Sequence, residues 1–240
     1  MRRENEYQFA SRIRFSEADH HQRITLPAII NYFQDCSTFQ SDALGCGIDA
    51  CRERARGWVL SSWQVEVERY PKLGEEIRVR TWACGFEGLY GYRNFCMETP
   101  DGQIAAWAYS VWVYMDMEKG RPARVDPEEA ERYGYGEPLE KEYAPRKIRL
   151  PKEAIEQPDF PVRRYHIDTN EHVNNCQYVQ MALEFIPAPQ EVVKMRAEYK
   201  KSAVFGDRIY PRYAKEENRE VVELCDAKGS PYALVEFKRR

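Results

Sequence analysis

Three polar residues at alternating positions near residue 170 are of types that can activate water. Asp168, Asn170 and His172 stand at i, i+2 and i+4, in a region that holds two of the four histidines of the chain. Residues two apart in an extended segment point to the same side of the backbone. A carboxylate, a carboxamide and an imidazole are therefore expected to converge, and such a set can take a proton from water and stabilise an oxyanion.

A helix predicted directly after these residues places backbone donors beside them. Its apolar spacing runs over residues 175–185, with Asn174 as an N-cap. The N–H groups of residues 173–175 would then polarise a carbonyl oxygen. A second interpretation stays open, because Asp and Asn side chains also bond their own backbone and shape turns. On that view, Asp168 and Asn170 only prepare the start of the helix.

The composition is typical of a soluble globular protein. Of the 240 residues 43% are hydrophobic, and the net charge of −3 argues against nucleic acid, whose partners usually have a basic domain. Seven cysteines without a signal peptide indicate reduced thiols. Residues 1–6 contain no signal-peptide core, and no apolar run approaches the roughly 20 residues of a membrane span. We expect a cytoplasmic protein without a membrane partner.

The predicted elements follow the same order twice: a strand, a helix and four strands. Asp19 corresponds to Asp168 at an offset of 149 positions, and the turn at Gly74 corresponds to that at Gly206 at an offset of 132. Each copy suggests an antiparallel sheet wrapped around one helix. The predicted strands are 7–15, 58–70, 75–84, 89–98 and 103–115 in the first copy, and 160–167, 191–201, 207–214, 219–226 and 232–238 in the second.

A connector rich in proline and charged residues separates the two copies. It contains one short predicted helix, Pro127–Tyr133. We expect an N-terminal domain over residues 1–135, a linker over 136–157 and a C-terminal domain over 158–240. Arg23 takes the position of His172 in the first copy, so we expect the first domain to shape a pocket and the second to carry the chemistry.

Three segments resemble the acyl-acyl carrier protein (ACP) thioesterases of plants and bacteria. They are the motif D-x-N-x-H-V-N-N-x-x-Y over residues 168–178, the Glu-Tyr-Lys-Lys run at 198–201, and residues 24–35. The resemblance implies an α+β double hotdog fold, in which each half is an antiparallel sheet around a long central helix. It also implies hydrolysis of fatty acyl-ACP thioesters, with an acyl-chain pocket in the N-terminal half and with Asp168, Asn170 and His172 as the catalytic residues.

The chain departs from the plant pattern after residue 201. Plant members carry an acidic residue and a cysteine there, whereas this chain has Ser202 and Ala203. A cysteine nucleophile is therefore missing at that point, and Ser202 is a candidate to hold a water. Cys176 is expected in the core, where free cysteines are commonly found. The candidate substrate-binding residues are Asn174, Asn175, Tyr178 and Ser202.

The resemblance also implies a partner and leaves alternatives. ACP is acidic, so a basic docking face is expected. No cofactor is implied because hydrolysis needs only water, and the histidine spacing lacks known zinc patterns. An acyl-coenzyme A (acyl-CoA) thioesterase, an enoyl-thioester hydratase and a non-catalytic acyl-thioester binding module are the alternatives, and both a monomer and a homodimer are open. The candidate docking residues are Arg163, Arg164, Arg196, Lys200 and Lys201.

Overall fold

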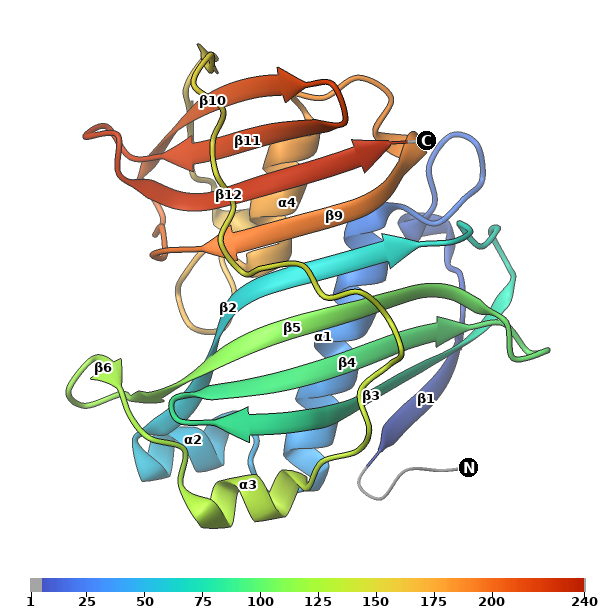
Figure 1. Ribbon diagram of the computed structural model, residues 1–240, viewed down its shortest axis with the longest axis vertical. Helices are drawn as coiled ribbons and strands as arrows, with labels where there is room; N and C mark the ends of the chain where they lie inside the picture. The colour runs from blue at the N-terminus through green and yellow to red at the C-terminus, as the bar shows by residue number, and fades with distance from the viewer. Residues whose placement is uncertain (1–5, 240) are drawn as a thin grey trace. The chain divides into compact units, whose positions relative to one another are not determined.

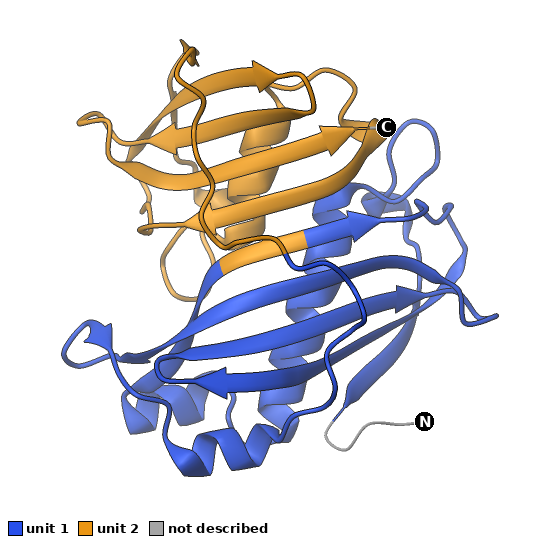
Figure 2. Cartoon of the chain, viewed as in Figure 1, with its two compact units in different colours: residues 1–61, 65–143 blue, residues 62–64, 144–240 orange. Residues whose placement is uncertain are grey.

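The chain forms two compact units, each with a set of antiparallel strands and a helix packed against them. A computed structural model describes residues 6–239. Unit 1 comprises residues 1–61 and 65–143, and unit 2 comprises residues 62–64 and 144–240 (Figure 2). The division after residue 143 falls within the segment for which we expect a linker. The prediction of no signal peptide rests mainly on residues 1–5, which lie outside the described part.

Unit 1 is an antiparallel sheet with helix α1 against one face (Figure 1). The strand order is β1-β3-β4-β5-β2, and α1 packs against β1, β3 and β4. The elements are β1 (Tyr7–Arg12), a 3₁₀ helix (Phe15–Glu17), α1 (Leu26–Ala43), α2 (Ile48–Arg54), β2 (Arg56–Val67), β3 (Glu76–Glu87), β4 (Tyr90–Glu98), β5 (Ile104–Asp116), β6 (Arg121–Pro122) and α3 (Pro127–Tyr133).

Helix α1 follows from local sequence signals. The Thr25 side chain accepts a hydrogen bond from the Ala28 N–H at 3.3 Å, which satisfies one of the donors left free at a helix start. Ile29, Ile30 and Phe33 follow at helical spacing and are fully buried against the sheet. One hydrophobic face thus fixes the helix inside unit 1.

Unit 2 repeats this plan with shorter elements. Its strand order is β9-β12-β11-β10-β7, and α4 packs against β11 and β12. The elements are β7 (Ile155–Glu156), β8 (Phe160–Pro161), a 3₁₀ helix (Arg164–His166), α4 (Asn175–Leu183), a second 3₁₀ helix (Pro189–Glu191), β9 (Val192–Tyr199), β10 (Arg208–Glu216), β11 (Arg219–Cys225) and β12 (Pro231–Arg239).

Two sequence predictions need correction at the domain entrances. The predicted strand 160–167 ends at Pro161 and continues as the 3₁₀ helix Arg164–His166, and the strand 7–15 likewise ends at Arg12. In unit 2 the turn forms because the Arg163 N–H donates to His166 Nδ1 at 2.9 Å. The other predicted strands are confirmed with small shifts of their ends, and the helix Pro127–Tyr133 is confirmed at its predicted bounds.

The linker packs on the sheets instead of passing over them as free coil. In unit 1, Leu139 and Tyr143 cover a buried cluster that contains Trp82 and Trp107. In unit 2, Ile148 packs against β11 and β12 in a second cluster. Figure 1 shows this segment of unit 2 in front of the sheet, with α4 behind it. The connector therefore completes both cores, a role that its weak apolar period does not predict.

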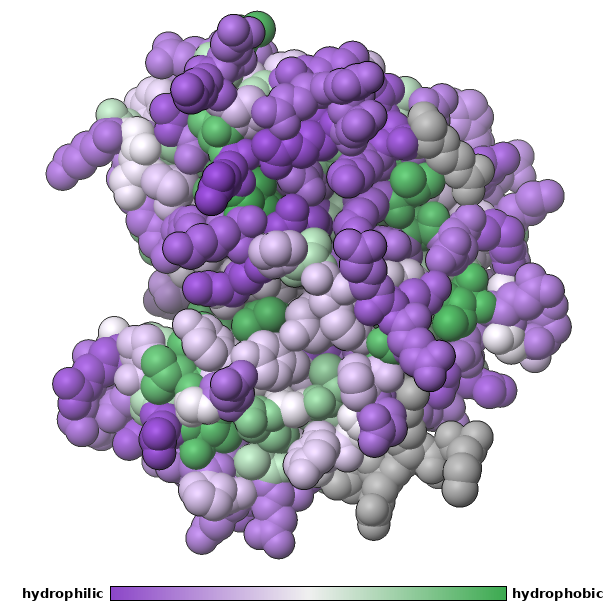
Figure 3. All heavy atoms as spheres, in the orientation of Figure 1, coloured by the Kyte–Doolittle hydropathy of each residue, from purple (hydrophilic) through white to green (hydrophobic). Residues whose placement is uncertain are grey.

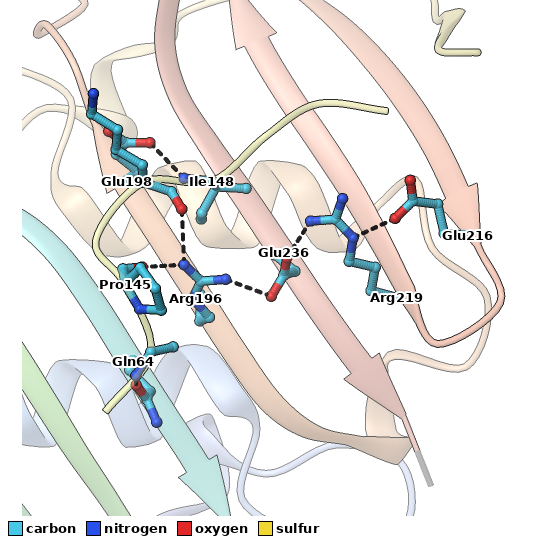
Figure 4. Close-up of polar contacts among 10 residues, drawn as sticks. Gln64, Pro145, Ile148, Arg196, Glu198, Glu216, Arg219 and Glu236 are labelled. Carbon is cyan, nitrogen blue, oxygen red and sulfur yellow. Dashed lines mark hydrogen bonds and ion pairs between the residues drawn. The ribbon is translucent and has the colours of Figure 1, made fainter. Parts of the chain in front are cut away.

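Buried ion pairs hold the linker on the sheet of unit 2 (Figure 4). The Arg196 guanidinium donates to the Lys147 carbonyl at 3.1 Å and to Glu236 at 3.0 Å. The Ile148 N–H donates to Glu198 at 2.8 Å. Glu198 and Glu236 are 1% and 3% exposed, and buried carboxylates are tolerated when they are paired in this way. The side chains that cover β10–β12 on the side facing the viewer are largely hydrophilic (Figure 3).

No helix in the described part of the chain combines the length and the apolar character that spanning a membrane requires.

Candidate active site

A tight loop in unit 2 carries the three candidate catalytic residues. An antiparallel bridge between Ile167 and Val173 closes the loop. Next to the bridge, the Asp168 N–H donates to the His172 carbonyl at 2.8 Å. Glu171 has a φ of 61°, so the chain reverses within the loop. Asp168 and His172 therefore stand opposite each other at the base of the loop.

The Asp168 carboxylate shapes the loop and keeps spare acceptor capacity. Its Oδ1 accepts a hydrogen bond from the Asn170 N–H at 2.8 Å. This is the turn geometry that we named as the alternative to catalysis. Oδ2 makes no hydrogen bond with any residue between 6 and 239, and the side chain is half-buried. One oxygen thus holds the loop and the other is free to bind water.

Asn170 and His172 have exposed side chains. Among the described residues, no hydrogen bond joins the side chains of Asp168, Asn170 and His172. The segment is not extended as we expected, because the positive φ of Glu171 turns the chain between the second and the third residue. Convergence of the three side chains on one water stays a prediction.

The start of α4 supplies one backbone donor to the loop. Asn174 is the N-cap, as expected, and its Oδ1 accepts from the Cys176 N–H at 2.9 Å. The Val173 and Asn174 N–H groups donate to the Ala203 and His166 carbonyls, both at 2.9 Å. From Val173 to Gln177, only the Asn175 N–H is without a partner among the described residues. Of the three backbone donors that we predicted, only the Asn175 N–H therefore remains available among the described residues.

Two tyrosines, one buried and one partly buried, fix the surroundings of that donor. Tyr178 OH accepts from the Ala203 N–H at 2.7 Å, and burial raises the pKa of Tyr178 to about 12. Tyr199 OH donates to the Asn175 carbonyl at 3.0 Å, and burial raises its pKa well above the ordinary value. Both phenols therefore stay neutral. Sequence reasoning missed Tyr199, although it belongs to the Glu-Tyr-Lys-Lys run. Ser202 is exposed and directly precedes Ala203.

Cys176 is a core residue and has no access to solvent. Its exposed fraction is 0%, and burial raises the pKa of its thiol to about 12. A thiolate nucleophile requires the opposite surroundings, exposed and electropositive. The expectation that Cys176 faces the core is confirmed.

Unit 1 contains a second copy of the catalytic loop. The Asp19 N–H donates to the Arg23 carbonyl at 2.8 Å, Ala18 and Ile24 form the closing bridge, and Gln22 has a φ of 58°. The internal repeat predicted from the sequence is thus confirmed at the level of hydrogen bonds. Its carboxylate differs in one respect, because Asp19 Oδ1 accepts two N–H groups, at 2.8 and 3.0 Å.

The buried imidazole of His166 supports the entrance to the loop. Its Nδ1 accepts the Arg163 N–H, and burial, with a smaller effect of the Arg163 charge, lowers the pKa of His166. In unit 1, Glu17 has the same role and accepts the Arg14 N–H at 2.8 Å. The neutral imidazole is a structural acceptor that the sequence motif alone does not reveal.

The five candidate docking residues separate into two groups. Arg163 and Arg164 are exposed, and the Arg164 guanidinium lies 4.6 Å from the centroid of the Phe205 ring. Phe205 and Tyr165 are 53% and 76% exposed, which gives this surface an aromatic component. We name Arg163, Arg164, Tyr165 and Phe205 the basic-aromatic surface.

The other candidates are engaged within unit 2. Arg196 belongs to the ion-pair network under the linker, with its side chain 13% exposed. Lys200 is paired with Glu198. Lys201 is paired with Asp226 and lies 4.5 Å from the centroid of the Tyr232 ring. Arg196 in particular is not presented to a docking partner.

Metal ligands are not grouped in the described residues. The rings of His20 and His21 are tilted by 41° to each other, with centroids 3.9 Å apart. Within residues 6–239, no set of three or more His, Cys, Asp or Glu side chains is arranged to hold a metal ion.

The two units together define a class of protein. Each is an antiparallel sheet around a helix, so the chain is a double hotdog, as the resemblance implied. Residues 4–133 match the family profile of the acyl-ACP thioesterase N-terminal domain, and residues 149–228 match that of the C-terminal domain. The chain belongs to the acyl-ACP thioesterase family.

Plant acyl carrier protein thioesterases that are similar in sequence to this chain support the family assignment. An oleoyl-acyl carrier protein thioesterase of Arabidopsis thaliana is 27% identical over 199 residues, covering 75% of this chain and 54% of its own length. A palmitoyl-acyl carrier protein thioesterase of Cuphea hookeriana is 32% identical over 159 residues, covering 60% and 37%. The chain thus spans about half the length of curated relatives that it matches.

Solved structures share the fold over the whole chain. An acyl-ACP thioesterase from Bacteroides thetaiotaomicron superposes with a TM-score of 0.89 at 22% identity, covering 98% of both chains. The 12:0-ACP thioesterase from Umbellularia californica gives a TM-score of 0.87 at 20% identity, covering 100% of this chain and 99% of the other. These likenesses establish the double hotdog fold.

Proposed function

We propose that this protein hydrolyses fatty acyl-ACP thioesters to free fatty acid and ACP, with water activated at Asp168. Membership of the family supports the reaction class. The observation that carries the site is the incomplete bonding of Asp168, whose Oδ2 stays open while Oδ1 holds the loop. That loop leads directly into the start of α4, where the Asn175 N–H is also unpaired among the described residues.

The proposed reaction uses only residues of unit 2. Asp168 takes a proton from water as the oxygen attacks the thioester carbonyl carbon, and Asn170 holds the water or the carbonyl. The Asn175 N–H, at the positive end of α4, stabilises the tetrahedral oxyanion. The intermediate collapses with cleavage of the carbon–sulfur bond, and His172 protonates the departing thiolate.

Covalent variants of this mechanism are limited by the residues present. Ala203 stands where plant members carry a cysteine, and Cys176 is sealed in the core. A thiol nucleophile is therefore not part of the proposal. Direct attack by Asp168, giving a mixed anhydride, is the remaining covalent route. Label found in Asp168 after a single turnover in isotopically labelled water would identify the anhydride route, because it enters when water attacks the Asp168 carboxyl carbon of the anhydride.

The proposed carrier docking site is the basic-aromatic surface. It lies at the 3₁₀ helix that precedes the catalytic loop, and its arginines are exposed and without a salt bridge to any described residue. An acidic carrier would be attracted to such charges, and exposed aromatic rings supply contact area.

The decisive experiment presents acyl-ACPs of graded chain length to the purified protein and measures the free thiol. Release of thiol with saturation kinetics supports the proposal. Higher kcat/KM on matched acyl-CoA would favour the acyl-CoA thioesterase. Saturable binding by the folded protein without thiol release would leave the binding module as the function.

A further inference from the structure

Arg93 on β4 is a buried cation in the interior of unit 1. Its exposed fraction is 7%. One terminal nitrogen, Nη1, donates to Gln40 Oε1 on α1 and to Thr81 Oγ1 on β3, the latter at 3.1 Å. The guanidinium carbon lies 5.4 Å from the centroid of the Tyr133 ring. Every one of these partners is a neutral group.

Within residues 6–239, no counter-ion accompanies this charge. Other largely buried arginines of the chain are paired, as Arg80 is with Glu6 and Glu98. Arg93 forms no ion pair with any described residue. Cys36 and Tyr133 are its ionisable neighbours that come closest to a compensating role, but burial raises the pKa of each to about 12, so both stay neutral. An isolated buried charge is costly unless something else pairs with it.

One edge of the Arg93 guanidinium makes no hydrogen bond with a described residue. Both hydrogens of Nη1 have acceptors, whereas Nε and Nη2 donate to no described residue. The unpaired side-chain nitrogens that are sealed from solvent include those of Arg80 and Arg212, but not those of Arg93. The Nε–Nη2 edge is the part of this 7% exposed side chain that is left for a ligand. This edge presents two parallel N–H groups, the geometry that binds a carboxylate in bidentate fashion.

The surroundings of that edge suit an aliphatic ligand. The cross-strand neighbours of Arg93 are Ala83 and Ser110. Their short side chains occupy little of the sheet surface beside the arginine. Two positions along β4 on the same face, Phe95 packs against Phe33 of α1 with ring centroids 5.3 Å apart. Apolar side chains thus lie on the same face of the sheet as the charge.

We propose that Arg93 is the anchor of a carboxylate-binding site inside unit 1, whose ligand is an aliphatic carboxylate. The ligand has two possible sources that share this chemistry. One is a free fatty acid, and the other is an acyl chain that carries a second carboxylate at its far end. The second source rests on the proposed function, whereas binding of the carboxylate itself does not.

The test measures binding of decanoate and of decanol, its neutral analogue, by calorimetry. Two variants report on the site: Arg93→Gln removes the charge, and Gln40→Glu supplies an internal carboxylate against the guanidinium without changing side-chain size. The wild type is expected to bind decanoate more tightly than decanol. Both variants are expected to lose decanoate affinity by roughly 10- to 100-fold, the range for hydrogen bonds between charged groups, while decanol affinity stays unchanged.

The second variant keeps the test valid if the first does not fold. Gln40→Glu neutralises a buried charge, so its melting temperature is expected to equal or exceed that of the wild type. A merely structural Arg93 would give the same stability change without any change in the ratio of decanoate to decanol affinity. Equal wild-type affinities for the two probes, or unchanged decanoate affinity in Gln40→Glu, would overturn the proposal.

Two further assays identify the source of the ligand. If it is a far carboxylate, kcat/KM on an acyl-ACP ending in a carboxylate exceeds that on the matching methyl-ended acyl-ACP, and Gln40→Glu removes the difference. If it is a free fatty acid, only inhibition by decanoate is relieved in that variant. A protein that binds decanoate through Arg93 but releases no thiol from any acyl-ACP would end the proposed function and leave this inference standing.

Discussion

Asp168 and Asp19 occupy the same position in two copies of one loop, but their carboxylates are bonded differently. Asp19 Oδ1 accepts two backbone N–H groups, whereas Asp168 Oδ1 accepts one. The common bond explains why an aspartate stands in both copies, since each loop needs an acceptor for its turn. The missing second bond distinguishes the copy that we assign to catalysis.

The paired substitutions Asp168→Asn and Asp19→Asn separate turn formation from chemistry. Asparagine keeps the oxygen that accepts the turn hydrogen bond, so both variants should stay within about 0.5 kcal/mol of the wild-type free energy of unfolding. Asp168→Asn should lower kcat on acyl-ACP by roughly 10²- to 10⁴-fold, the contribution of a positioned general base. Asp19→Asn should retain wild-type turnover. Equal activity of the two variants would remove Asp168 from the mechanism.

The Asn175 N–H can be deleted without disturbing the helix. Asn175 is the first residue of α4, a position that proline favours, and the preceding Asn174 has φ −59° and ψ 141°, which proline permits. Asn175→Pro should therefore fold normally and lose about 10²- to 10³-fold in kcat, as for removal of an oxyanion donor. The control Asn175→Ala keeps the N–H and should lose far less. If proline and alanine have the same effect, the side chain matters and the backbone donor does not.

Docking of the carrier should depend on charge at the basic-aromatic surface. Arg164→Glu is expected to lower kcat/KM on acyl-ACP by about 5- to 10-fold at low salt, and added salt should shrink the difference. Turnover of acyl-pantetheine, which lacks the carrier, should not change. The matched control is Lys215→Glu, at an exposed lysine of β10. Loss of activity on both substrates would point to damage at the catalytic loop.

The buried His166 should make folding sensitive to mild acid. Because burial lowers its pKa below the ordinary 6.5, the unfolded chain takes up a proton at a higher pH than the folded chain does. The stabilisation is complete above pH 6.5 and is lost as the pH falls toward the folded pKa. His166→Asn keeps an acceptor for the Arg163 N–H and cannot titrate.

Chemical denaturation at about pH 7.5 and about pH 5.5 measures this effect. The loss of unfolding free energy on acidification should be smaller in His166→Asn than in the wild type. An identical loss in both proteins would show that His166 does not titrate differently in the folded and unfolded chains.

Much of the fold was predictable because its signals are local. The N-cap Asn174 was identified from residue type and the apolar spacing that follows, and the helix Pro127–Tyr133 was predicted within a segment rich in proline and charged residues. Alternation located most strands because it reflects the two faces of a sheet. The duplicated aspartate loop was visible as a repeat since both copies obey the same turn rules.

Partners distant in sequence were not predictable in this way. Arg196 has the composition of a docking residue, but Glu236 and the linker carbonyls engage it. The Val173 N–H has the position of an oxyanion donor, but the carbonyl of Ala203 accepts it. Each outcome depends on which strand comes alongside, and no local period contains that information.

The sequence by itself therefore determined the two hotdog halves, the loop at residue 168 and the absence of a cysteine after the Glu-Tyr-Lys-Lys run. The tertiary structure decided that one oxygen of Asp168, the N–H of Asn175 and one edge of Arg93 have no hydrogen-bond partner among residues 6–239. Binding and catalysis use the groups that folding leaves unpaired. A sequence does not show which donors and acceptors are paired, so only the hydrogen bonds of the folded chain identify the unpaired groups.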